Sequence, residues 1–180
     1  MESTNLIIRE TVFSDCTFFA EWEKKSYIQE SFIMSSDRDY EEIVKEYVIR
    51  SLSPDKLQFT IIYREEEKPI GRIYISNIDP QADSVDLTRI YIGVEEYLGK
   101  GLGEEAMRLV LEHCFIYLHT ERVSIDHVPT NQRAEELYKK LGFQDEGVMR
   151  NAGKKNGRYV DLHLMSMLRA EYYENCRRIL

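Results

Sequence analysis

The sequence has few cysteines and no long apolar run. Only 3 of its 180 residues are Cys, and Cys16, Cys114 and Cys176 are too widely spaced for a disulfide framework or a paired zinc site. The longest apolar runs cover a few residues, against the roughly 20 that a membrane-spanning helix needs. The first ten residues have no signal-peptide character. We therefore expect free thiols, a cytoplasmic protein and no membrane span.

Proline and histidine are also scarce. The 4 prolines are isolated, and no Gly/Ser-rich linker or internal repeat divides the chain. This favours a single domain over residues 1–180. The 4 histidines form no H-E-x-x-H or Cys/His pattern, so we expect no metal site.

Positive charge is in the minority. There are 24 Lys and Arg against 32 Asp and Glu, which gives a formal net charge of −8. That balance argues against a protein that coats nucleic acid or an anionic membrane, and it suits cationic partners. A hydrophobic content of 43% with 12 Tyr is typical of a packed globular chain.

The hydrophobic period changes several times along the chain. It predicts strands at 6–10, 57–63, 70–75, 85–94, 123–125, 143–148 and 159–167, and helices that begin near Ser14 and cover 39–52, 101–117 and 131–141. The order is β-α-α-β-β-β-α-β-α-β-β, with a mainly antiparallel run followed by a strand, crossover helix, strand unit. We therefore predict an α+β fold around a mixed, mostly antiparallel sheet of about seven strands.

A glycine-rich turn lies between a predicted strand and a predicted helix. Gly99, Gly101 and Gly103 alternate there. Without Cβ atoms the backbone can approach a ligand closely, and the helix N-terminus adds partial positive charge. These features predict a pyrophosphate cradle. A flexible surface turn is the alternative.

The turn does not match a nucleoside-triphosphate P-loop, because Lys100 precedes Gly101 and no Ser or Thr follows. It formally satisfies the dinucleotide fingerprint at Gly101, Gly103 and Ala106, with Asp126 near the expected distance downstream. The residues between the strand and the turn, and the lack of repeated βαβ units, count against that NAD(P) reading. An NAD(P)-binding protein is therefore kept only as a remote alternative.

Four stretches together resemble the GNAT superfamily of acetyl-coenzyme-A-dependent N-acetyltransferases. Residues 98–103 match the family's Arg/Gln-x-x-Gly-x-Gly/Ala signature, with Leu98 in place of Arg or Gln, and residues 131–143 are similar to N-x-x-A-x-x-L-Y-x-K-x-G-F. Residues 86–92 and 146–168 extend the likeness, the latter toward ribosomal-protein alanine and diamine N-acetyltransferases. The resemblance implies the GNAT fold, with helices on both faces of the sheet.

The resemblance also implies a ligand and site residues. Acetyl-CoA is the expected cosubstrate, bound by Ile90, Tyr91, Ile92, Leu98, Gly99, Lys100, Gly101, Leu102, Gly103, Asn131, Ala134 and Tyr138. The amine attacks the thioester directly in a ternary complex, with Tyr138 as general acid and Asp86 as a candidate general base. Purely structural roles are the alternatives: packing for Tyr138, a helix N-cap for Asn131 and an exposed surface position for Asp86.

The acceptor is the least defined partner. We expect the acceptor to be a peptide or protein N-terminal α-amine, with polyamine, amino-sugar or antibiotic amines as alternatives. A further alternative is a module that binds acetyl-CoA without transferring the acetyl group. Acidic and aromatic side chains of the first helices would suit a cationic amine; they are Glu21, Trp22, Glu23, Tyr27 and Glu30. No nucleic-acid or membrane partner is expected, and a homodimer is open.

Overall fold

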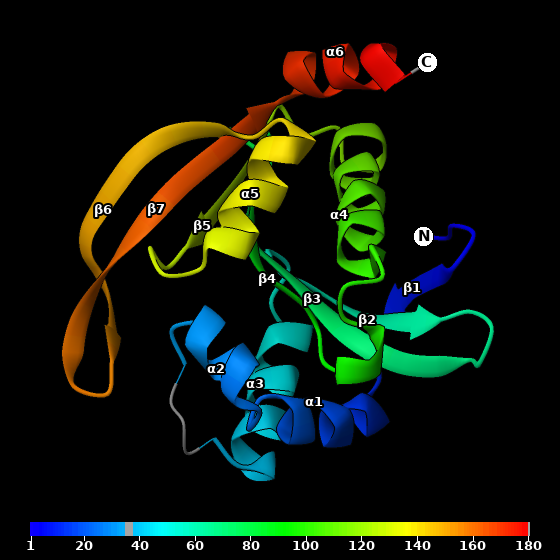
Figure 1. The fold of residues 1–180 in the computed structure, drawn as a ribbon, viewed down its shortest axis with the longest axis vertical. Helices are drawn as coiled ribbons and strands as arrows, with labels where there is room; N and C mark the ends of the chain where they lie inside the picture. The colour runs from blue at the N-terminus through cyan, green and yellow to red at the C-terminus, as the bar shows by residue number, and fades with distance from the viewer. Residues whose placement is uncertain (35–37, 180) are drawn as a thin grey trace.

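The computed structural model describes residues 1–34 and 38–179, and its centre is one seven-stranded sheet (Figure 1). The strands are β1 (Leu6–Glu10), β2 (Leu57–Tyr63), β3 (Lys68–Asp79), β4 (Ser84–Ile92), β5 (Arg122–His127), β6 (Gln144–Lys155) and β7 (Arg158–Leu168). Their order in space is β1-β2-β3-β4-β5-β7-β6. Only β4 and β5 are parallel neighbours. The predicted mixed, mostly antiparallel α+β sheet is confirmed.

Helices cover both faces of the sheet, as expected. They are α1 (Cys16–Trp22), α2 (Ser26–Ser31), α3 (Tyr40–Ser51), α4 (Leu102–Glu112), α5 (Gln132–Leu141) and α6 (Arg169–Ile179). In Figure 1, α1 to α3 lie together at the lower end, while α4 and α5 lie above them. No helix among the described residues is long and apolar enough to cross a membrane.

The helix count differs from the prediction in two places. Three helices, not two, connect β1 to β2, because the chain turns between Trp22 and Ser26. The C-terminal helix α6 was not expected. Its charged sequence has no strong apolar stripe, and it is anchored through Tyr172, whose ring stacks on Phe115 at 4.8 Å.

Capping residues begin α3 and α5, and end α5, at the positions that the sequence predicted. Asp39 caps α3, its carboxylate accepting from the Glu42 N–H at 2.9 Å. The Asn131 side chain accepts from the Ala134 N–H at 3.2 Å, which confirms its predicted N-cap role at α5. Gly142 ends that helix with φ of +100°, the left-handed conformation that favours glycine.

The hydrophobic residues form two cores, one on each face of the sheet. The larger includes Ile61, Ile73, Val110 and Phe115 and lies under α4 and α5. The smaller joins α1, α2 and α3 to β4 through Phe19, Trp22, Ile28, Ile43 and Tyr91. Strand β4 therefore packs against helices on both sides, which holds it in place where it leaves β5.

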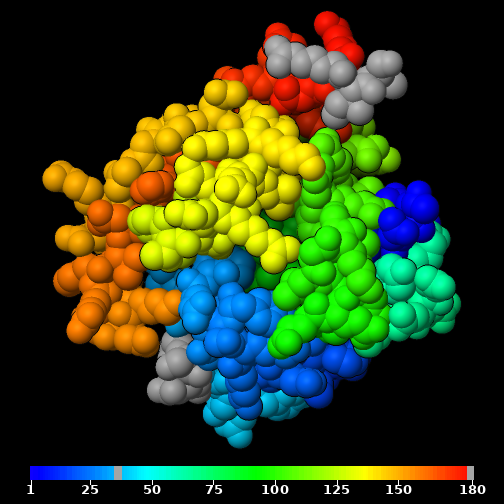
Figure 2. Space-filling view, viewed as in Figure 1, coloured from blue at the N-terminus to red at the C-terminus, as the bar shows by residue number. Residues whose placement is uncertain are grey.

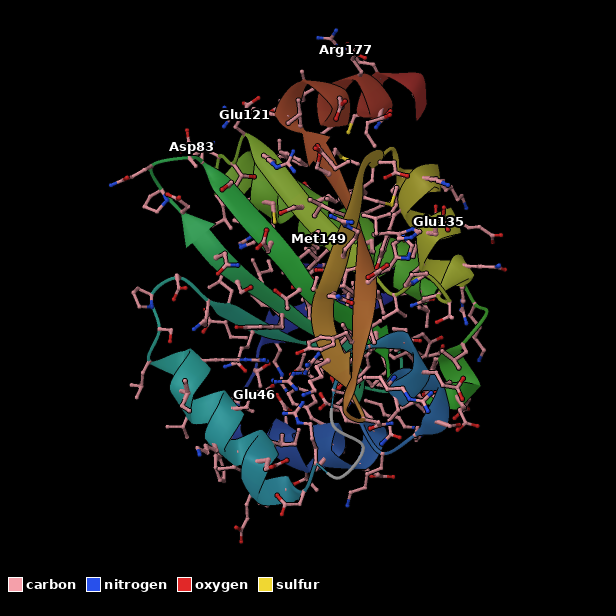
Figure 3. All side chains as sticks on the ribbon, turned by 90° about the vertical axis from the view of Figure 1, so that its left-hand side faces the viewer. Glu46, Asp83, Glu121, Glu135, Met149 and Arg177 are labelled. Carbon is pink, nitrogen blue, oxygen red and sulfur yellow. The ribbon has the colours of Figure 1, made fainter. Side chains whose placement is uncertain are left out.

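The β6–β7 hairpin arches away from the sheet and returns to α2. Figure 3 shows it passing in front of the sheet near Met149. At its tip Lys155 Nζ donates to the Phe32 carbonyl at 3.1 Å and also to the Gln29 carbonyl. A Cβ on Gly153 would lie 2.0 Å from Ile33 Cδ1, so a larger residue there would require the Ile33 side chain to move. The hairpin thus encloses the sheet face beside α2.

Candidate active site

The parallel strands β4 and β5 separate and leave a gap. They pair only from Ser84 to Asp86 on β4 and from Arg122 to Ser124 on β5. Beyond that point β4 continues to Ile92 with hydrogen-bonded neighbours on its β3 side alone. Its backbone groups facing β5 are therefore available to a ligand, since an unpaired peptide group in a cleft needs a partner.

A cavity of about 340 Å³ opens along this gap. Figure 2 shows the hollow where the surfaces of α5 (yellow), the residues just before α4 (green) and α2 (blue) meet. Its lining includes eleven of the twelve residues predicted to bind the cofactor: Ile90, Tyr91, Ile92, Leu98, Gly99, Gly101, Leu102, Gly103, Asn131, Ala134 and Tyr138. Residues from Ile90 to Tyr138 are thus brought together around one cavity.

The remaining predicted residue, Lys100, is not part of that lining. Its ammonium group lies 5.2 Å from the centre of the Tyr97 ring, within the range of a cation–π contact. Leu98, in the position where Arg or Gln was expected, packs partly buried against the larger core. Arg133, which sequence reasoning did not single out, lines the cavity and supplies a cation there.

The glycine turn has the geometry of an anion cradle. Gly99 and Gly101 have φ of +75° and +79°, and Gly101 is the N-cap of α4. A Cβ built on Gly99, Gly101 or Gly103 would meet no atom within 4 Å, so each glycine faces open space. The first N–H groups of α4 lack intrahelical partners by geometry. The residues present therefore fit a pyrophosphate group.

Two acidic residues follow the turn, and both are paired. Glu104 accepts from Lys140 Nζ at 2.6 Å and from Arg108 Nη2 at 2.8 Å. These hydrogen bonds lower the pKa of Glu104, and hydrogen bonds from Ser3 and Asn5 lower that of Glu105 despite partial burial. Their charges are thus partly balanced beside the cradle.

Tyr138 is a buried residue of the cavity lining. It is 6% exposed, and its ring makes an edge contact with His127, the centroids being 6.0 Å apart. Burial, and then the charge of Asp126, raise the pKa of Tyr138 well above its usual range. The phenol is therefore protonated at neutral pH. Tyr138 packs against its neighbours and is also one of the residues that line the cavity, so the packing role and the acid role are both open to it.

Two carboxylates lie on the other face of the gap. Asp86 pairs in register with Ser124, and Asp126 is two residues further along β5, so both side chains project from the same face. Asp86 accepts from Asn77 Nδ2 at 2.6 Å and forms a close hydrogen bond with Ser124. Burial raises the pKa of Asp126, and the charge of Asp86 adds to that rise.

Asp126 is a candidate that sequence reasoning considered only through the dinucleotide fingerprint. Neither Asp126 nor the predicted base Asp86 is among the residues that line the cavity. The Asp126 side chain remains exposed to water, while surrounding protein and the charge of Asp86 raise its pKa. A proton acceptor works best when its pKa approaches the operating pH. An acidic residue at the end of a strand that leaves its neighbour is the signal that would have found it.

Two acidic or aromatic residues expected at the acceptor are instead in the interior. Trp22 is 3% exposed and Glu23 is 2% exposed. Glu23 accepts from Arg72 Nη1 at 2.7 Å and from the Tyr91 hydroxyl at 3.1 Å, so its charge is used within the fold. Tyr27 does line the cavity, and burial raises its pKa to about 12.

Comparison with known proteins identifies the family. The model described as "Acetyltransferase (GNAT) domain" matches residues 5–144. The uncharacterized N-acetyltransferase p20 of Bacillus licheniformis is 30% identical over 122 residues, which are 68% of this chain and 67% of that protein. The putative ribosomal N-acetyltransferase YdaF of Bacillus subtilis is 28% identical over 102 residues, 57% of this chain and 55% of that protein.

The fold has close solved counterparts. The crystal structure of spermidine N-acetyltransferase from Vibrio cholerae in complex with CoA and spermine has a TM-score of 0.85, with 22% identity over 95% of this chain and 99% of that chain. At that identity the likeness shows the fold alone. The family match covers most of the chain. The chain therefore belongs to the GNAT family, and it is an N-acetyltransferase that uses acetyl-CoA.

Proposed function

We propose that this chain transfers an acetyl group from acetyl-CoA to a protein or peptide N-terminal α-amine by direct attack in a ternary complex. The observation that carries the proposal is the gap between β4 and β5. It has the buried phenol of Tyr138 on the helix side and the carboxylates of Asp86 and Asp126 on the other face. Acid and base candidates therefore flank one opening.

Bound acetyl-CoA supplies an electrophilic thioester carbon and a thiolate leaving group. The glycine turn holds the pyrophosphate through the N–H groups of 101–103 and the N-terminal end of α4. Asn131 and Ala134 line the channel for the pantetheine arm. The unpaired backbone of residues 90–92 orients the carbonyl, because β5 has already diverged there.

Tyr138 holds the proton that the departing sulfur takes. Its pKa is raised by burial and by the charge of Asp126, above the reference value of about 8.5 for a thiol. Tyr138 is therefore a weak proton source, which stabilises the departing thiolate by donating a hydrogen bond and gives up its proton as the carbon–sulfur bond breaks. A water molecule replaces that proton after product release. No enzyme nucleophile is required in this scheme.

Asp126 is our choice of proton acceptor, with Asp86 beside it. Asp86 is held by Asn77 and Ser124, so its charge is fixed in place and raises the pKa of Asp126. Asp126 stays open to water and can take the amine proton directly or through one water. Asp86 as the base itself is the alternative, and the two roles differ in their pH profiles.

An α-amine fits these groups better than a polyamine. At pH 7 an amine with a pKa of about 8 is roughly one-tenth neutral, whereas one near 10.4 is neutral in fewer than one molecule in 10³. One carboxylate with a raised pKa, such as Asp126, suits the first case, because part of the amine is already neutral. The polyamine alternative is supported by relatives such as the spermidine N(1)-acetyltransferase of Escherichia coli, 31% identical over 77 residues, 43% of this chain and 41% of that protein.

An amine screen tests the proposal. The purified chain is mixed with acetyl-CoA and, in turn, peptides with free N-terminal Ala or Ser, spermidine and an amino sugar, and free thiol is measured. Peptides are expected to give the highest kcat/KM, and N-acetylated versions of the same peptides serve as the matched control. A preference for spermidine would favour the polyamine acceptor. Acetyl-CoA binding without thiol release would favour a binding module.

A further inference from the structure

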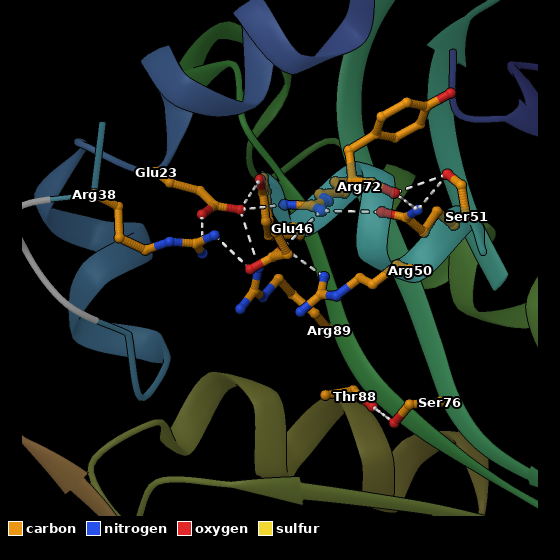
Figure 4. Close-up of polar contacts among 12 residues, drawn as sticks. Glu23, Arg38, Glu46, Arg50, Ser51, Arg72, Ser76, Thr88 and Arg89 are labelled. Carbon is orange, nitrogen blue, oxygen red and sulfur yellow. Dashed lines mark hydrogen bonds and ion pairs between the residues drawn. The ribbon is translucent and has the colours of Figure 1, made fainter. Parts of the chain in front are cut away.

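Six charged side chains meet between α1, α3 and the sheet, and we call them the Arg–Glu cluster (Figure 4). They are Glu23, Arg38, Glu46, Arg50, Arg72 and Arg89. Four are guanidinium groups and two are carboxylates, so their formal charge is +2 in a chain of −8. Unbalanced charge away from water is costly. The described part of the cluster therefore lacks two negative charges.

The two carboxylates have no spare capacity. Glu23 Oε1 accepts from Arg72 Nη1 at 2.7 Å and from Arg89 Nη1 at 3.1 Å. Glu46 is in ion-pair distance of all four arginines of the cluster. These arginines lower the pKa of Glu46 against the opposing effect of burial, so it remains ionised. Protonation of either acid would only increase the positive excess.

Arg50 is the arginine left least satisfied. Its Nη1 lies 2.5 Å from Glu46 Oε1 but has no hydrogen bond of acceptable geometry to any described residue. Its guanidinium stacks on the Tyr74 ring, 3.5 Å from the centroid. Burial lowers the pKa of Arg50 to about 10; Glu46 opposes that change, while repulsion from Arg72 and Arg89 adds to it.

An open cavity of about 460 Å³ borders the cluster at Arg50. It lies along α3, and its lining residues are Arg38, Glu42, Lys45, Glu46, Ile49, Arg50, Lys56 and Tyr74. Four cations thus face two acids, and one of those acids, Glu46, is already engaged with arginines. None of these residues lines the cavity at the β4–β5 gap. The two cavities are therefore separate.

We propose that this cavity binds a small free anion with at least two negative charges, of the phosphate or carboxylate type. Guanidinium groups present paired N–H donors that match the oxygens of such anions. Two negative charges would balance the cluster, and the volume is in the range of small-molecule sites. Lys45 and Lys56 contribute from the rim, where they are not part of the buried cluster.

Binding is tested on the full chain by thermal unfolding. Orthophosphate and citrate are titrated in a chloride buffer of constant ionic strength, with saturating CoA so that the glycine turn is occupied. A ligand at 100 times its Kd is expected to raise Tm by about 5 °C or more in a chain of this size. Sodium chloride at the same ionic strength should give no saturable rise.

Variants locate the anion. The double variant Lys45→Gln/Lys56→Gln leaves the buried cluster intact, and we expect its apparent Kd to rise about tenfold with its anion-free Tm close to that of the parent. Lys139→Gln removes an exposed lysine from α5 and should keep the parent response. No saturable rise in the parent chain, or an equal rise in the double variant, would overturn the proposal.

Discussion

Burial and the charge of Asp126 on β5 raise the pKa of Tyr138 on α5, although Asp126 projects from the face of β5 opposite to the one on which Tyr138 packs. His127, the next residue after Asp126, packs its ring against Tyr138, so strand alternation directs Asp126 to the other face. Asp126 lies two residues beyond Ser124, the last residue of β5 that pairs with β4. In our scheme the amine enters on the Asp126 side and the thiolate leaves on the Tyr138 side.

Tyr138→Phe should slow turnover without unfolding the site. The ring packs against His127 and Phe143, and phenylalanine keeps that packing while removing the acid. We expect kcat to fall about 100-fold, with the Kd for CoA changed less than about threefold by calorimetry. Unchanged turnover would remove Tyr138 from the mechanism and leave it a packing residue.

The pH dependence of kcat separates Asp126 from Asp86. Burial and the charge of Asp86 raise the pKa of Asp126, so the base is active above that pKa and is lost as the pH falls through it. Asp86→Asn removes the repelling charge, which should move the acidic limb of the profile to lower pH while activity is kept. The ionisation of the amine is the same in both enzymes and cancels in the comparison.

Asp126→Asn is the matched variant for that experiment. Above the pKa of Asp126 it should lower kcat about 100-fold. Below that pKa the loss should be smaller, because the parent enzyme has lost the same base, so the part of the acidic limb due to Asp126 should disappear. If Asp86→Asn gave the large loss and Asp126→Asn only a small one, Asp86 would be the base and the assignment made here would be wrong.

Gly103→Ala should separate ligand binding from stability. A Cβ at this position would meet no protein atom within 4 Å, and alanine is the better helix former by up to about 1 kcal/mol. We expect urea unfolding without ligand to show equal or slightly higher stability, while the Kd for CoA rises about tenfold because the methyl group occupies the cradle.

Gly101→Ala provides the contrast within the same turn. Gly101 has φ of +79°, a conformation that costs other residues about 1 kcal/mol or more. This variant should lose both stability and affinity. Equal CoA affinity in the parent and Gly103→Ala would show that the cradle does not contact the cofactor.

Glu23→Gln should destabilise the fold strongly. Glu23 is 2% exposed and accepts from both Arg72 and Arg89, so its neutralisation leaves buried guanidinium groups without their counter-charge. The free energy of unfolding, measured in urea, should fall by about 3 kcal/mol. Glu21→Gln, on the exposed side of the same helix, should change it by less than about 0.5 kcal/mol. Equal effects would show that the ion pairs contribute little.

The sequence predicted the parts that local chemistry controls. The β-branched and aromatic run at 57–63 forms β2. Asn131 and Gly142 mark the two ends of α5 as predicted, because capping depends on residues a few positions away. Most of the residues predicted to bind the cofactor line one cavity, since the turn and the start of α5 are short motifs that each carry their own geometry. Lys100 was the exception, because its side chain turns toward Tyr97.

Long-range pairing explains what was missed. Glu23 read as an exposed acid on the first helix, but its partners Arg72 and Arg89 are 49 and 66 residues away. Asp126 gained its altered pKa from Asp86, which lies across a strand pair. Neither contact produces a pattern in the sequence around Glu23 or Asp126. Such contacts are decided by strand register, which requires the folded sheet.

The release of CoA thiol in the presence of an amine tests the central claim most directly. We predict that acetyl-CoA and a peptide with a free N-terminus give thiol release and an equal amount of acetylated peptide by mass spectrometry, with the rate about 100-fold lower in Tyr138→Phe. Binding of acetyl-CoA with no amine-dependent thiol release, for peptides, spermidine and amino sugars alike, would contradict the account.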